Sequence, residues 1–141
     1  MIALDTNVLV RYLAQDDASQ TAVATALIET RLSAEQPGYV SALVFAELHC
    51  VLTRLYGIDR QRFADIARGL LMARALRFEN LQAAWNALQA FEDGHGFRDA
   101  LLAELADAAG CQTTLTFDRD FSRHPKARML AAAGTSPAPS N

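Results

Sequence analysis

Two kinds of segment alternate along this chain. Short runs of apolar, β-branched or aromatic residues predict strands over residues 2–4, 39–40, 75–78 and 113–117. Longer segments carry apolar residues three and four positions apart, a spacing that indicates one buried helix face. These segments predict helices over residues 7–14, 18–32, 42–56, 60–73, 81–93 and 97–109. The pattern is typical of an α/β fold with a parallel sheet.

Residues at the expected helix ends support these boundaries. Ser41, Asp59 and Asn80 precede helical segments and suit the N-cap position. Gly57 and Gly110 follow helical segments, where a glycine commonly ends a helix. The stretch "DRDFSRHP", residues 118–125, is predicted to be a loop. No internal repeat interrupts this organisation.

Length and composition indicate one soluble domain. The chain has 141 residues, of which 51% are apolar and 21% charged, an ordinary globular balance. No apolar run approaches the roughly 20 residues that span a bilayer, and the N-terminus lacks a secretory pattern. We therefore expect a cytoplasmic protein without a membrane segment. Residues 1–130 are predicted to form the domain, and residues 131–141, mostly Ala, Gly, Ser and Pro, a disordered tail.

The charge balance leaves two interpretations open. A net charge of −3 and a pI near 5.5 argue against a generic nucleic-acid-binding protein. However, Lys126 is the only lysine, and the arginines that supply the other cations suit phosphate groups. Genome composition would give the same bias. Cys50 and Cys111 are far apart in apolar sequence and are predicted to be core residues of a reduced protein.

Two acidic residues stand directly after predicted strands. Asp5 follows the first strand, and Asp118 follows the last, in "TLTFDRD". The carboxyl ends of parallel strands are where sites form in α/β sheets. An alternative for Asp5 is a helix N-cap, and an alternative for Asp118 and Asp120 is turn formation around Arg119. The strand-end position favours Asp118 over Asp120.

Glu47 is predicted to lie on the apolar face of a helix. Its neighbours three and four positions away are Leu43, Val44, Cys50 and Val51. A carboxylate in such surroundings is costly unless a cation, a metal or several donors compensate it. The alternatives are an ion pair with Arg54 or a place at the mouth of a cleft.

Asp99 lies in the first turn of the helix predicted over residues 97–109. Leu102, Ala103 and Ala106 share its helix face, so we expect the side chain to point inward. The alternative is that its carboxylate simply complements the helix dipole.

Taken together, the four acids predict a cation site. Converging carboxylates repel one another, so a cluster of them is stable chiefly around a divalent ion. Oxygen donors without His or Cys indicate Mg²⁺ or Mn²⁺ rather than Zn²⁺. His49, His95 and His124 lack metal-binding spacing and are predicted to be structural or surface residues. A Mg²⁺ ion held by carboxylates suits phosphodiester hydrolysis.

Four motifs, in order, resemble those of PIN-domain ribonucleases, and specifically the VapC toxins of type II toxin–antitoxin pairs. "ALDTNVLVRYL" supplies Asp5, "SALVFAEL" supplies Glu47, "FRDALLAELADAAGC" supplies Asp99 and "TLTFDRDF" supplies Asp118. The resemblance extends to about residue 130. It departs from the family pattern at Arg98, where a small residue is common.

The resemblance implies a three-layer α/β/α sandwich with a short, mostly parallel central sheet. It implies a metal-dependent endoribonuclease in which Asp5, Glu47, Asp99 and Asp118 are catalytic and hold Mg²⁺ or Mn²⁺. It further implies a homodimer, a cognate antitoxin that covers the site, and a structured RNA substrate such as tRNA. Supporting roles are expected for Asn7 and Thr116, and RNA phosphate contacts for Arg11, Arg98 and Arg119.

Three alternative functions stay in consideration. A haloacid-dehalogenase-type phosphatase also starts with a strand-end Asp, but it needs an acid where this chain has Asn7 and a late lysine, for which only Lys126 exists. A phospho-receiver domain needs paired early acids and a lysine after a late strand, which "LTFDRD" lacks. A PIN-like adaptor that binds RNA without cleaving it would gain nothing from negative charge concentrated beside phosphates.

Overall fold

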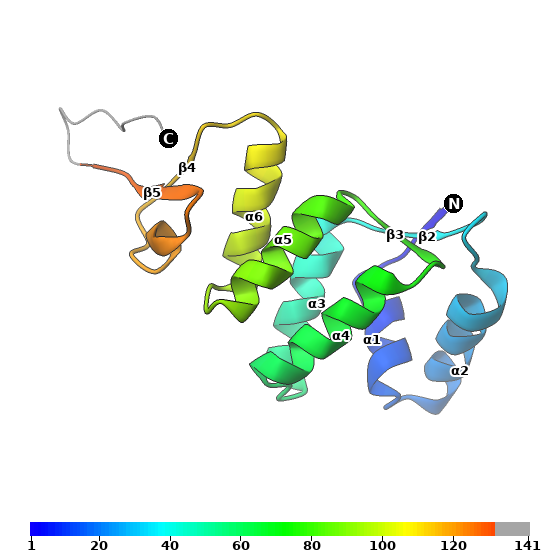
Figure 1. Ribbon diagram of the computed structural model, residues 1–141. Helices are drawn as coiled ribbons and strands as arrows, with labels where there is room; N and C mark the ends of the chain where they lie inside the picture. Colours follow the sequence, from blue (N-terminus) through cyan, green and yellow to red (C-terminus); the bar gives the residue numbers. More distant parts are fainter. Residues whose placement is uncertain (132–141) are drawn as a thin grey trace. The chain divides into compact units, whose positions relative to one another are not determined.

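Helices and short strands alternate in the computed structural model, which describes residues 1–131 (Figure 1). The α-helices are α1 (Thr6–Ala14), α2 (Ala18–Ala26), α3 (Ala42–Leu55), α4 (Arg60–Met72), α5 (Leu81–Glu92) and α6 (Phe97–Ala108). The strands are β1 (Ile2–Ala3), β2 (Gly38–Val40), β3 (Leu76–Phe78), β4 (Thr114–Thr116) and β5 (Ala127–Met129). Internal contacts divide the chain into two units, Met1–Leu81 and Gln82–Asn141.

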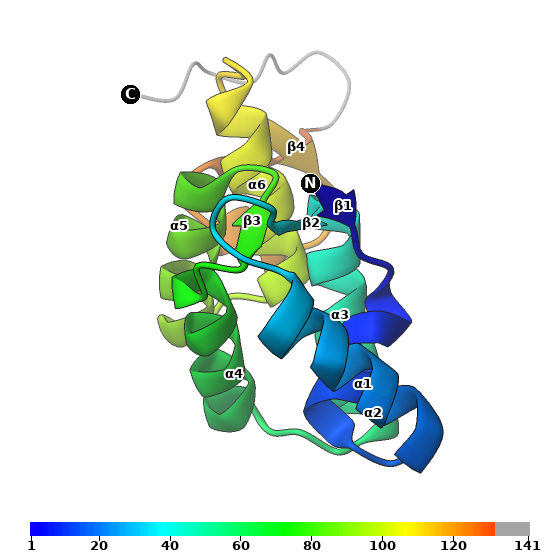
Figure 2. The same cartoon turned by 90° about the vertical axis from the view of Figure 1, so that its right-hand side faces the viewer.

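The first unit contains a three-stranded parallel sheet of order β1-β2-β3 (Figure 2). Ile2 is aligned with Gly38, and Gly38 in turn with Leu76. The apolar run over residues 2–4 suggests a buried first strand, but both residues of β1 are exposed, Ile2 by 51%. The buried residue is Leu4, which follows the strand.

Helix caps account for the helix starts in this unit. Asp17 Oδ1 accepts a hydrogen bond from the Gln20 N–H at 3.0 Å, and α2 begins after it. The predicted caps Ser41 and Asp59 are confirmed, because each side chain accepts a hydrogen bond from a backbone N–H three residues later. The helix predicted over residues 18–32 is confirmed, with a π-helical last turn, η1 (Leu27–Arg31).

The start of β2 requires a glycine, because side chains pack closely against the backbone there. A Cβ atom on Gly38 would come within 2.8 Å of the Cδ1 atoms of both Leu4 and Leu32. The predicted turn at Pro37 and Gly38 therefore continues directly into a strand whose first residue must be small. The buried side of α3 packs in the same unit through Phe45, Leu48 and Leu52.

The second unit carries a two-stranded parallel sheet, β4 and β5, with Thr114 aligned with Ala127. The short helix η2 (Phe121–Arg123) contacts both strands (Figure 1). The prediction of a plain loop over residues 118–125 is thus wrong at η2, and β5 is a strand that the sequence did not reveal. β5 has only three residues and begins with alanine, which has low strand propensity. It is held because Ala127 packs with Ala103 and Phe121.

Parallel strands alternating with helices confirm the predicted α/β class. Cys50 is half-buried and Cys111 is exposed, so the prediction of two core cysteines is wrong for Cys111. Within residues 1–131, none of the helices has the length and apolarity needed to cross a membrane. The tail predicted over residues 131–141 lies outside the described residues, apart from residue 131, and the single-domain boundary at residue 130 stays a prediction.

Candidate functional site

Asp5 stands between β1 and α1 and caps the helix. Its Oδ1 accepts a hydrogen bond from the Thr6 N–H at 2.8 Å, with the extended backbone expected of an N-cap. The capping alternative is therefore realised. A carboxylate offers about four acceptor positions, and the side chain is exposed, so capping is compatible with binding a cation.

Glu47 is exposed on α3, so the prediction that it lies on the buried apolar face is wrong. The buried stripe of α3 runs through Phe45 and Leu48, whereas Leu43, one turn before Glu47, is 69% exposed. Apolar residues surround this helix on more than one side, and spacing alone selected the wrong stripe. The partner of Glu47 is Thr6 rather than the Arg54 considered as an alternative: Thr6 Oγ1 donates to Glu47 Oε2 at 2.6 Å.

Thr6 contacts both candidate acids of the first unit, and sequence reasoning assigned it no role in the site. It is 5% exposed, and it donates through its N–H to Asp5 and through its hydroxyl to Glu47. The available signal was a hydroxyl residue directly after a strand-end acid. The supporting role was instead assigned to Asn7, whose exposed side chain lines a groove of about 370 Å³ between α1 and α2.

Asp99 and Asp118 form the acidic pair of the second unit. Burial raises the pKa of Asp99, the nearby Arg98 lowers it, and the charge of Asp118 raises it further, so the net shift is upward. Arg98 Nη1 lies 3.7 Å from Asp99 Oδ1. The expected inward face of α6 is correct for Ala103, which is buried, but wrong for Leu102, which is 40% exposed.

Asp118 organises the turn after β4. Its Oδ1 accepts hydrogen bonds from the N–H groups of Asp120 at 2.8 Å and Phe121 at 3.3 Å. Its own N–H donates to Thr116 Oγ1 at 2.9 Å, so Thr116 supports Asp118 through the backbone. The turn-forming alternative for Asp118 is realised, and the exposed carboxylate keeps acceptor positions beyond the two bonds.

The three arginines expected at RNA phosphates have different surroundings. Arg11 donates to Gln20, Asp16 and Tyr56, in a network that joins α1, the start of α2 and the end of α3. By contrast, the side chain of Arg98 is 74% exposed, and Arg119 is exposed beside Asp118. Arg98 and Arg119 are therefore more accessible to a phosphate than Arg11 is.

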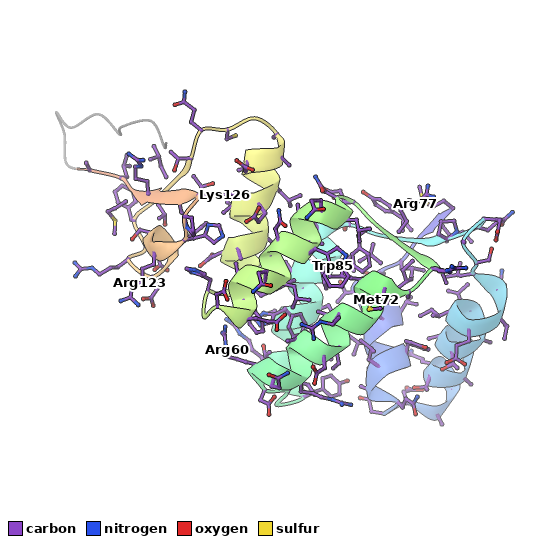
Figure 3. All side chains as sticks on the ribbon, viewed as in Figure 1. Arg60, Met72, Arg77, Trp85, Arg123 and Lys126 are labelled. Carbon is purple, nitrogen blue, oxygen red and sulfur yellow. The ribbon has the colours of Figure 1, made fainter. Side chains whose placement is uncertain are left out.

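A polar cluster around the buried Glu104 and His124 in the second unit was not predicted. It consists of Asn86, Glu104, Asp107, His124 and Lys126, and is named here the Glu104 cluster. Lys126 lies beside α6 (Figure 3), with Nζ 2.6 Å from Glu104 Oε2 and 3.1 Å from Asp107 Oδ2. Asn86 Nδ2 donates to the same Glu104 oxygen at 3.3 Å, and His124 Nε2 lies 3.7 Å from Oε1.

The histidines have structural surroundings, as predicted. His124 is 4% exposed, its Nδ1 accepts from the Lys126 N–H, and its ring lies 5.1 Å from that of His95. His49 meets Phe63 edge to face. Burial lowers the pKa values of His49 and His124, so both rings favour the neutral form.

The donor chemistry of the two acidic pairs fits a hard divalent ion. Asp5 and Glu47 belong to the first unit, and Asp99 and Asp118 to the second. Over residues 1–131, no group of three or more His, Cys, Asp or Glu side chains is arranged to hold a metal. Each pair nonetheless presents exposed or half-exposed carboxylate oxygens, and repulsion between Asp99 and Asp118 is what a bound cation would relieve.

Asp99→Asn tests, without RNA, whether burial and the charge of Asp118 make the Asp99 carboxylate costly to the fold. The pKa of Asp99 is higher in the folded protein than in the unfolded chain. The charged carboxylate therefore destabilises the fold once the pH exceeds the ordinary pKa of an aspartate. The variant should therefore melt no lower than wild type in EDTA at pH 7.5, with a difference that shrinks at pH 4. A lower melting temperature would support the helix-dipole alternative, which predicts a loss of about 0.3–1 kcal/mol.

The chain is similar to a known protein family. A family model described as PIN domain matches residues 2–127, and comparison with curated proteins found no match. Members of this family are generally nucleases, and thus hydrolases, that act on nucleic acid and use divalent metals. This match confirms the predicted PIN-domain family and the α/β fold class, and the more specific VapC-type assignment stays a prediction. The family match covers most of the chain, and the parallel strands of the chain alternate with helices as predicted. The chain therefore belongs to the PIN-domain family.

Proposed function

We propose that this protein is a Mg²⁺- or Mn²⁺-dependent endoribonuclease and the toxin of a VapC-type toxin–antitoxin pair. The observation that carries the proposal is the set of four acidic motifs in PIN order, within a chain that a PIN model matches over residues 2–127. The hydrogen bonds that link Asp5 and Glu47 through Thr6 support it, since they connect two acids from distant parts of the chain.

In this proposal Asp5, Glu47, Asp99 and Asp118 are the metal ligands. A bound divalent ion would supply Lewis-acid stabilisation of the phosphate and lower the pKa of a water. Thr116 holds the backbone of Asp118, and the exposed Arg98 and Arg119 bind RNA phosphates. The partners are a structured RNA such as tRNA, a second copy of the chain and an antitoxin.

The alternatives are less well supported. The family match disfavours the strand-end phosphatase, and Lys126, its required late lysine, is paired with Glu104 and Asp107. A binding-only adaptor would gain no RNA affinity from Asp99 and Asp118, whose charges repel each other and would repel phosphates.

Removal of divalent metal should abolish RNA cleavage. Purified protein incubated with a pool of transfer RNAs should produce discrete fragments with Mn²⁺ or Mg²⁺ and none with EDTA, because the oxygen-only ligand set binds hard cations. Fragment ends are read by sequencing, and activity should return when Mn²⁺ is added in excess of EDTA. Cleavage that persists after chelation and dialysis would exclude the metal-dependent mechanism.

A further inference from the structure

We propose that Thr6 is a positioning residue that sets both Asp5 and Glu47 for metal binding. This inference rests on the proposed function and deepens it. A single residue, the first of α1, donates hydrogen bonds to both acids of the first unit: its N–H to Asp5 Oδ1 at 2.8 Å and its Oγ1 to Glu47 Oε2 at 2.6 Å.

The three residues differ in exposure in a way that suits this role. Thr6 is 5% exposed and fixed by its place in α1, whereas Asp5 and Glu47 are exposed. Glu47 lies on α3, 41 positions along the chain, and α1 packs against α3. The buried hydroxyl therefore anchors a long, otherwise mobile side chain from a second helix beside the strand-end acid.

Two other threonines of the first unit, Thr30 and Thr53, bond differently. Thr53 Oγ1 donates to the backbone carbonyl of His49, and Thr30 Oγ1 to that of Ala26, the usual local bonds of helical threonines. At the first position of α1 the residue four places earlier, Ile2, is in β1. The hydroxyl of Thr6 is thus available for a side chain far away in sequence, and it meets a carboxylate.

A neutral donor has an advantage over a cation at this place. A hydroxyl orients Glu47 but leaves its full negative charge for a metal ion, whereas an ion pair with an arginine would neutralise part of it. Because the carboxylate is already held in one orientation, less conformational entropy is lost when a metal ion binds. Loss of such an outer hydrogen bond typically lowers metal affinity or activity about 10–100-fold.

Mn²⁺ affinity of the full chain, without RNA, tests this role. Free Mn²⁺ is measured by electron paramagnetic resonance while each protein is titrated. Thr6→Val keeps the shape and removes the hydroxyl, so it should weaken Mn²⁺ binding about 10–100-fold. Thr6→Ser keeps the hydroxyl and should bind as wild type does. Thr53→Val, which removes a helical hydroxyl that bonds only to backbone carbonyls, is the control and should also bind as wild type does.

The outcomes separate this inference from the proposed function. Thr6→Val with wild-type Mn²⁺ affinity, while Asp5→Asn loses binding, would overturn the role of Thr6 and leave the metal site intact. Wild-type protein that binds no Mn²⁺ would overturn both. If Thr6→Val does not fold, Thr6→Ser and Thr6→Ala form the test, since both lose the methyl group and only serine keeps the hydroxyl. Equal Mn²⁺ affinities of that pair would overturn the role.

Discussion

Bacteria that produce the Asp5→Asn variant are expected to grow at the rate of uninduced cells, whereas the wild-type protein should arrest growth. In vitro, RNA cleavage should fall at least about 100-fold, because even the loss of an outer hydrogen bond to a metal ligand costs 10–100-fold. Asparagine caps a helix as well as aspartate does, so the hydrogen bond to the Thr6 N–H and the start of α1 should survive. The change therefore removes a charge without removing a structural contact.

Asp17→Asn is the matched control for that prediction. Asp17 is also an N-cap in the first unit, with Oδ1 accepting from the Gln20 N–H at 3.0 Å, and it is not one of the four proposed ligands. This variant should remain toxic. Equal toxicity of Asp5→Asn and wild type, at equal protein levels on an immunoblot, would show that growth arrest does not depend on the Asp5 carboxylate.

Local signals were sufficient to locate most elements of the fold. The caps at Ser41 and Asp59 act through hydrogen bonds three residues away, so the sequence contains both partners within one helical turn. Gly57 has a φ of 63°, the left-handed conformation that ends a helix most easily at glycine. Such features need no tertiary information.

Features that depend on tertiary partners were not predicted. β5 exists because Thr114, Leu115 and Thr116 pair with a segment more than ten residues later, not because its own sequence favours a strand. Ile2 in β1 is 51% exposed, whereas Leu76 and Phe78 in β3 are buried, although both strands lie at sheet edges. Strand propensity does not specify which strand residues other elements cover.

The order of the motifs selects four candidate acids, but it does not predict their surroundings. The order of the motifs indicated Asp5, Glu47, Asp99 and Asp118, whereas the exposure of Glu47 depends on which stripe of α3 packs inward. Thr6 adjoins an identified acid, yet its bond to Glu47 spans 41 positions. Sequence motifs therefore indicate candidate acids, whereas the side chains that contact those acids depend on tertiary structure.

Removal of Lys126 is expected to have the largest effect on stability. Glu104 is 7% exposed and depends on Lys126 Nζ at 2.6 Å, with the Asn86 bond longer at 3.3 Å. Lys126→Met keeps an unbranched apolar stem but leaves the carboxylate without its cation. An underpaired buried charge costs about 1–3 kcal/mol. Because the Lys126 side chain is 34% exposed and water can partly replace it, we expect about 1–2 kcal/mol, or roughly 3–8 °C in melting temperature.

Arg123→Met is the control for this loss. Arg123 belongs to the same unit and pairs with Asp120 at 3.7 Å, but the side chains of both are mostly exposed, 73% and 87%. Exposed pairs contribute little to the free energy of unfolding. Its melting temperature at pH 7.5 should therefore stay close to that of wild type, while Lys126→Met melts several degrees lower.

The pH dependence of the stability loss in Lys126→Met shows whether charge or packing causes that loss. Burial lowers the pKa of His124, Glu104 raises it, and both His95 and Lys126 lower it. In the wild type the unfolded chain thus takes up a proton at His124 more readily than the fold does, and this residue costs stability as pH falls below about 6.5. Without Lys126, the pKa of His124 should rise. Protonation of His124 can then partly compensate the negative charge of Glu104. The difference in melting temperature between wild type and Lys126→Met should therefore narrow from pH 7.5 to pH 5.5. A difference that stays constant would show that Lys126 contributes packing rather than charge to the Glu104 cluster.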